Sequence, residues 1–86
     1  MLKISQVGTA DHSATLKLEG RVVGPWVDEL RRIGELVLSE RRKLKLDLAD
    51  VSFADASGVN LLFSFKSRGV LLWNCSPFIE EQLKAR

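Results

Sequence analysis

The sequence is poor in the side chains that most often carry chemistry. Its 86 residues include one histidine, His12, and one cysteine, Cys75. These two residues are separated by most of the chain and make neither an internal disulfide nor a cluster of metal ligands. A glycine-rich phosphate loop of the Walker or dinucleotide-binding type is missing as well. We therefore expect no enzyme activity, no metal and no cofactor.

Long apolar runs and a strong charge of one sign are also missing. No apolar stretch approaches the roughly 20 residues that span a bilayer, and no basic segment precedes an apolar one as in a secretory signal. Lys and Arg total 13 against 11 Asp and Glu, which gives a net charge of +2. Basic and aromatic residues are not interleaved as in nucleic-acid binding grooves. These absences predict a cytoplasmic protein that neither inserts into a membrane nor binds nucleic acid.

The sequence does have the composition of a globular protein, and turn-forming residues separate its apolar segments at regular intervals. It is 45% hydrophobic, and its length is that of one domain, which we place at residues 1–86. Apolar and polar residues alternate in segments 14–19 and 43–48, as in strands with one buried face. Segments 2–7 and 70–73 predict two further strands. Because segment 70–73 is apolar without alternation, we expect it to be a central strand buried on both faces.

A helix-like segment follows each of the last three predicted strands. Pro25 suits the first position of the first helix. Asp55 precedes the second helix, which extends to about Lys66. Ser76 and Pro77 open the third with a cap and a first-turn proline. The first helix carries an apolar stripe at spacings of three and four residues: Trp26, Leu30, Ile33 and Val37.

The resulting order, β-β-α-β-α-β-α, predicts an α/β fold. Strands that alternate with helices imply right-handed crossovers and a mostly parallel four-stranded sheet, with the first strand antiparallel at an edge. Lys45 and Asp47 give one predicted strand a charged face. A sheet covered on both sides would bury these charges, so we expect two layers, with helices mainly on one face.

The segment from Leu46 to Val59 has the most specific pattern in the chain. It reads LDLADVSFADASGV, which matches "L-D-L-x-x-V-x-F-x-D" at the end of a strand and approximates "S-[ST]-G" at the start of a helix. Through this pattern the sequence resembles the STAS family, the domains named for sulfate transporters and anti-sigma factor antagonists. Supporting matches are Leu18-Glu19-Gly20, Arg68-Gly69-Val70-Leu71-Leu72 and Asn74-Cys75-Ser76-Pro77, and the likeness extends from about Ala14 to Leu83.

The resemblance implies a STAS-like fold and a non-catalytic module that binds another protein. In anti-sigma factor antagonists the residue after the motif's aspartate is usually a serine that the partner kinase phosphorylates, and phosphorylation there breaks the complex. This chain has Ala56 at that position and a hydroxyl only at Ser57. Either Ser57 is the phosphorylation switch, or binding is constitutive. The family's chains usually continue with a further strand or helix, whereas this sequence, shortened at the C-terminus, stops at Arg86.

Asp55 and Gly58 each have a structural and a functional interpretation. Asp55 is placed to cap the second helix by accepting a backbone N–H. It is also placed to orient Ser57 toward a partner or a kinase. Gly58 either lets another backbone approach closely or packs helix on strand. A phosphate at this helix N-terminus would meet backbone donors and a favourable dipole.

The second helix has more apolar surface than a sheet covers. At about 100° per residue, its apolar residues span roughly 200°, whereas a helix on a sheet buries a stripe only somewhat wider than ~100°. Either the neighbouring helices cover the surplus, or one flank is exposed, at Leu61 or along Val59 and Phe63. We predict that the helix and the loop before it form the partner-binding surface. Its residues are Asp55, Ala56, Ser57, Gly58, Val59, Asn60, Leu61 and Phe63.

Three functions are compatible with these observations. The first is a bacterial regulator of transcription that resembles an anti-sigma factor antagonist and binds an anti-sigma factor of the serine kinase type. The alternative is a small cytoplasmic STAS subunit of a bacterial ABC lipid-transport complex, which would bind the ABC ATPase. Such subunits often lack the phosphorylated residue, so Ala56 favours this alternative. A small enzyme is the third and is disfavoured, since no catalytic constellation is present. A homodimer is compatible with the sequence too.

Overall fold

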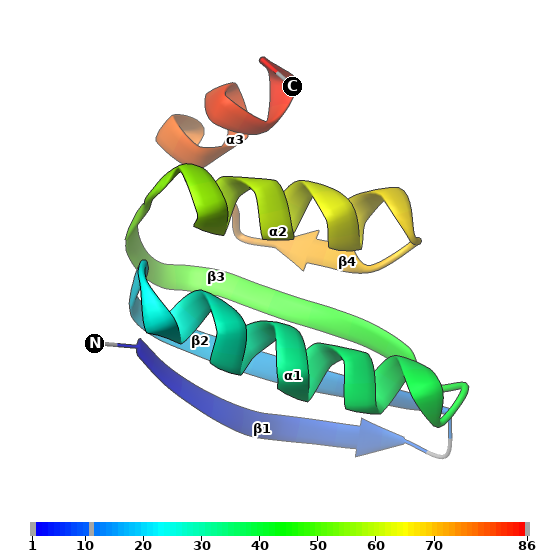
Figure 1. The fold of residues 1–86 in the computed structure, drawn as a ribbon. Coiled ribbons are helices and arrows are strands. Elements are labelled where there is room, and N and C mark those ends of the chain that lie inside the picture. The colour runs from blue at the N-terminus through cyan, green and yellow to red at the C-terminus, as the bar shows by residue number, and fades with distance from the viewer. Residues whose placement is uncertain (1, 11, 86) are drawn as a thin grey trace.

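Four strands form one mixed sheet in the order β1-β2-β3-β4. The computed structural model describes residues 2–10 and 12–85. β1 is antiparallel to β2, while β2, β3 and β4 are parallel to one another. The predicted order of elements and the mostly parallel sheet with an antiparallel edge strand are confirmed. The elements are β1 (Leu2–Ala10), β2 (Ser13–Val22), α1 (Pro25–Ser39), β3 (Lys43–Ala54), α2 (Ala56–Ser67), β4 (Leu71–Trp73) and α3 (Pro77–Lys84) (Figure 1).

The pair β2 and β3 forms the centre of the sheet. Leu16 lies beside Leu46, and the two strands stay paired from Ser13 opposite Lys43 to Val22 opposite Ala54. Because side chains alternate between faces, this register brings the leucines of both strands to one face. The buried leucines of the pair are Leu16, Leu18, Leu44, Leu46 and Leu48.

α1 and α2 lie on this apolar face, in front of the sheet in Figure 1. The two helices also pack on each other, because a Cβ added at Gly34 of α1 would come within 2.5 Å of the Phe65 ring of α2. Only glycine permits this close approach without moving the ring. The apolar stripe of α1 is rotated from the predicted one: Val27 and Gly34 are fully buried, together with Leu30 and Val37, whereas Trp26 and Ile33 are partly buried.

Among the residues that the structure describes, the opposite face of the sheet carries polar contacts instead of helices (Figure 1). Lys17 Nζ lies 3.2 Å from Asp50 Oδ2, and Asn74 donates a hydrogen bond of 3.0 Å to Asp47. Lys45 Nζ lies 4.5 Å from the centre of the Trp73 ring. This face agrees with the expected two-layer arrangement.

β4 differs from the prediction. It is an edge strand in the described part of the chain, paired only with β3, and the side chains of Leu71 and Trp73 are 51% and 49% exposed. The expectation of a central strand buried on both faces is therefore wrong. An unbroken apolar run shows that polar residues are missing, but it does not show that both faces are covered.

The described helices are also short. In residues 2–10 and 12–85, no helix is both long enough and apolar enough to cross a membrane.

Candidate functional site

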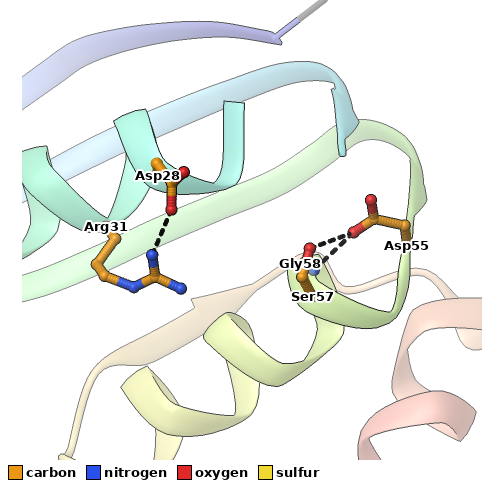
Figure 2. A network of polar contacts seen from close by, with 5 residues as sticks. All are labelled: Asp28, Arg31, Asp55, Ser57 and Gly58. Carbon is orange, nitrogen blue, oxygen red and sulfur yellow. Dashed lines mark hydrogen bonds and ion pairs between the residues drawn. The ribbon is translucent and has the colours of Figure 1, made fainter. Parts of the chain in front are cut away.

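The junction between β3 and α2 is organised by the carboxylate of Asp55. Its Oδ1 accepts hydrogen bonds from the N–H of Gly58 at 2.8 Å and from the hydroxyl of Ser57 at 3.0 Å, as Figure 2 shows. Its Oδ2 accepts the N–H of Gly24 at 3.0 Å. The predicted capping role of Asp55 and its contact with Ser57 are therefore both present.

The contact with Gly24 joins a second helix to the site. Gly24 is the N-cap residue of α1 and has a positive φ of 54°, a conformation that favours glycine. Both helices begin where β2 and β3 end, since Asp55 also donates its N–H to the carbonyl of Val22 at 3.2 Å. One carboxylate thus serves the N-termini of α1 and α2.

Hydrogen bonding to Asp55 stabilises its charged form. The N–H of Gly24, followed by that of Gly58, lowers the pKa of this carboxyl below its ordinary value. The local surface therefore keeps a fixed negative charge beside the Ser57 hydroxyl near neutral pH.

Gly58 packs α2 against the end of β2. A Cβ at this position would lie 2.2 Å from the carbonyl oxygen of Val22, a distance that no side chain tolerates. Of the two interpretations of Gly58, the packing of helix on strand is the one seen. The backbone that approaches it belongs to the chain itself.

Burial divides the predicted partner-binding residues into two groups. Ala56, Ser57 and Asn60 are exposed, Phe63 is 38% exposed and Asp55 is half-buried. By contrast, the side chains of Val59 and Leu61 are 1% and 5% exposed, and Gly58 is buried. Because these three residues are buried, we leave them out of the surface that we consider further. We call the exposed residues Ala56, Ser57, Asn60 and Phe63 the α2 surface.

The neighbours of α2 account for this burial. α2 contacts both α1 and α3 as well as the sheet. With neighbours on three sides, the helix can bury a wider apolar arc than one that packs on a sheet alone. The burial of Val59 and Leu61 agrees with cover by neighbouring helices, one of the two alternatives for the surplus. Only Phe63 remains on the flank that was expected to be exposed.

A pair of aromatic rings beside the site was not predicted. Phe53 and Phe78 are stacked with ring centres 6.2 Å apart, and both are exposed. Phe53 also borders a cleft of about 440 Å³ that Asp55, Ala56 and Gln82 help to line. Phe53 is part of the sequence pattern, but its partner comes from α3, and only the folded chain brings them together.

The described residues provide no metal site. In residues 2–10 and 12–85, no three His, Cys, Asp or Glu side chains come together to hold an ion. Cys75 is half-buried and unpaired, and burial raises the pKa of its thiol. The thiol is therefore protonated near neutral pH and poorly nucleophilic.

Comparison with known proteins rests on structure. No family model and no curated protein matches the sequence. The unphosphorylated form of SpoIIAA, an anti-sigma factor antagonist, superposes with a TM-score of 0.75 at 17% identity, over 98% of this chain and 84% of that one. The chain has a STAS-like fold.

A second solved structure agrees. A protein of the DUF3478 family from Shewanella loihica PV-4, described as having a SpoIIAA-like fold, gives a TM-score of 0.60 at 10% identity. That match covers 98% of this chain and 75% of the other. At such low identities the likeness establishes the fold of this STAS-like chain and leaves its partner to the chemistry of its own residues.

Proposed function

We propose that this STAS-like chain is a non-catalytic regulatory module that binds another protein through the α2 surface. The observation that carries the proposal is the Asp55 carboxylate, which holds the Ser57 hydroxyl at 3.0 Å on the exposed first turn of α2. SpoIIAA, whose fold it shares, is an anti-sigma factor antagonist. By analogy we assign an anti-sigma factor of the serine kinase type as the partner. The setting is then the bacterial cytoplasm and the process transcription regulation.

The composition of the α2 surface supports binding to a protein. Ser57, Asn60 and Phe63 are all exposed, and Asn60 and Phe63 are neighbours on the helix surface because they are three residues apart. Apolar groups with a polar rim are typical of protein interfaces. The exposed rings of Phe53 and Phe78 add apolar surface, with Phe53 lining a cleft next to Asp55 and Ala56, and aromatic residues are enriched at such contacts.

Phosphorylation is the step in which this chain departs from the antagonist pattern. Ala56 offers no hydroxyl, and the hydroxyl of Ser57 is engaged by Asp55. A phosphate on Ser57 would bring about −1.5 to −2 charges next to a carboxylate, although the helix N-terminus favours anions. We therefore infer that partner binding is constitutive, or that Ser57 is a slow acceptor.

Ala56 is also compatible with the second candidate function, that of a subunit of an ABC lipid-transport complex. A subunit of an ABC lipid-transport complex needs a permanent contact with its ATPase and no phosphorylated residue. An exposed alanine at the first position of α2 fits such a contact.

A pull-down from the native cell tests both candidates. The bait is the wild-type chain, with Ser57→Asp and Asn60→Asp as variants of the α2 surface. Leu36→Asp is the control, because Leu36 lies on α1 and is 56% exposed. A captured histidine-kinase-like ATPase supports the antagonist, and an ABC ATPase supports the alternative. If both α2 variants capture the partner as well as wild type does, the proposed surface is wrong.

A further inference from the structure

The outer edge of β4 carries no charged residue, proline or β-bulge, and the only usual protection that it has is its short length of three residues. Exposed edges are normally interrupted by lysine, proline or a β-bulge, which prevent pairing with another chain. β1, the other edge of this sheet, has Lys3 and a bulge between Gln6 and Gly8. β4 has neither, because its sequence is Leu71-Leu72-Trp73. Among the residues that the structure describes, no strand pairs with its outer side.

The side chains of β4 are apolar on both faces of the sheet. Leu71 and Trp73 point to the helix-free face, since their β3 neighbours are Lys45 and Asp47, and about half of each side chain is exposed. Leu72 points to the helix side and is half-buried. A strand added at this edge would therefore meet apolar side chains above and below.

A groove follows the same edge on the helix side. It has a volume of about 360 Å³ and an apolar floor that includes Leu72, Cys75 and Leu83. Lys66, in the last turn of α2, borders it near the start of β4, and Glu80, in the first turn of α3, borders it beyond the end of β4. Neither charge forms a salt bridge with another described residue. The groove thus has unpaired charges of opposite sign at its two ends.

We propose that a second copy of this chain pairs antiparallel with β4 along this edge. Leu72 then faces Leu72 of the second copy on the two-fold axis, and Leu71 faces Trp73 in each direction. Directly opposed aromatic and aliphatic side chains stabilise antiparallel strands. The contact is isologous, so it closes as a dimer. The four strands of each copy become one continuous sheet.

The charges select the antiparallel orientation. Reversing one copy places Lys66 of each chain at the end of the groove where the other chain has Glu80. A parallel arrangement would instead bring like charges together, which disfavours it. Charge complementarity and the self-matching order of Leu71, Leu72 and Trp73 both favour a second copy over an unrelated extended segment.

The first experiment measures mass by sedimentation over a range of concentrations. A three-residue strand makes a small interface, and small interfaces associate weakly, so we expect a concentration-dependent shift from 9.6 kDa to twice that mass. Leu71→Lys should weaken dimerisation at least tenfold. Leu36→Lys, at a similarly exposed position on α1, should leave it unchanged. A wild-type chain that stays monomeric, or a dimer that Leu71→Lys does not weaken, would overturn the proposal.

The second experiment tests the orientation. Lys66→Glu and Glu80→Lys each place like charges together and should weaken the homodimer. A mixture of the two variants restores both ion pairs and should form a heterodimer with near wild-type affinity. If the mixture associates no better than either variant alone, the antiparallel orientation is wrong.

A disulfide tests the register. Leu72→Cys in a Cys75→Ser background places two thiols across the two-fold axis and should give a covalent dimer on mild oxidation, whereas Leu36→Cys in the same background should not. Equal cross-linking of both variants would contradict the register. These outcomes are independent of the α2 surface, since Asn60→Asp should reduce partner capture without changing dimerisation.

Discussion

The N–H of Gly24 donates a hydrogen bond of 3.0 Å to the carboxylate of Asp55, 31 positions further along the chain. The same carboxylate caps α2 through Gly58 and holds the hydroxyl of Ser57. A helix cap normally serves one helix. Here one side chain fixes the beginnings of two helices and the orientation of the Ser57 hydroxyl.

Asp55→Ala should therefore destabilise the fold more than a change that removes one surface ion pair. The variant loses both the cap of α2 and the contact with Gly24. Asp28→Ala is the control, because it removes only the exposed ion pair with Arg31 on α1 (Figure 2), and such pairs contribute little. Urea unfolding should show a clearly lower midpoint for Asp55→Ala. Equal midpoints for the two variants would contradict the shared cap.

The same carboxylate predicts a dependence of stability on pH. Its pKa in the folded chain is lowered, mainly by the N–H of Gly24, so the folded state binds fewer protons than the unfolded state. The stabilisation is present above the unfolded pKa of about 3.9 and is lost as the pH falls through the folded pKa. The melting temperature should decline below about pH 4, and Asp55→Asn should flatten that decline. Part of it should remain, because the pKa of Asp47 is also lowered, first by Asn74.

Gly58→Ala should destabilise the chain by about 2 kcal/mol, the range of overpacked sites. Its Cβ would clash with the backbone carbonyl of Val22 at 2.2 Å, and backbone cannot rotate away. Gly8→Ala is the matched control, since the nearest atom to its Cβ would lie 3.9 Å away. Chemical denaturation compares the two variants, and a neutral Gly58→Ala would show that β2 and α2 separate easily.

A kinase of the anti-sigma type should label Ala56→Ser better than wild type. A serine there places its hydroxyl on the exposed first position of α2, whereas the hydroxyl of Ser57 is held by Asp55. Incubation with kinase and ATP, followed by mass spectrometry, locates the phosphate. Labelling of the wild-type chain should be slow and should disappear in Ser57→Ala. Efficient labelling that survives Ser57→Ala would show that the switch lies elsewhere.

Phe63→Asp and Val59→Asp should separate binding from folding. Phe63 is partly exposed, so its variant should keep the circular dichroism of the fold and lose partner affinity. Val59 is fully buried, and an unpaired carboxylate there costs several kcal/mol, which should unfold much of the chain. A folded Val59→Asp protein would mean that α2 is less firmly packed than the structure indicates.

Most of the fold could be predicted because most helices and strands have recognisable local sequence signals. Alternation identified β2 and β3, Pro25 and Pro77 marked the starts of α1 and α3, and the aspartate before α2 is the cap. The sequence was wrong about β4 and left open which flank of α2 is buried. Both depend on which neighbours cover an apolar residue, and that is decided by the sheet order and by helices from distant parts of the sequence.

The candidate site was predictable to a similar extent. The resemblance to STAS domains drew attention to Asp55 and Ser57, and their contact follows from helix geometry. The bond to Gly24 and the stacking of Phe53 on Phe78 join residues that no local pattern connects. The groove beside β4 likewise brings together Lys66 and Glu80, which no local sequence pattern connects.

The shared cap also has a consequence for the order in which the chain acquires structure during synthesis. α1 is synthesised before β3 and Asp55, so its first turn lacks this partner for the Gly24 amide until the later segment has been made and has folded. The Gly24 amide should therefore become protected from hydrogen exchange at the same time as the amides of α2. Protection of the Gly24 amide from exchange would thus report when the second half of the chain has folded onto the first.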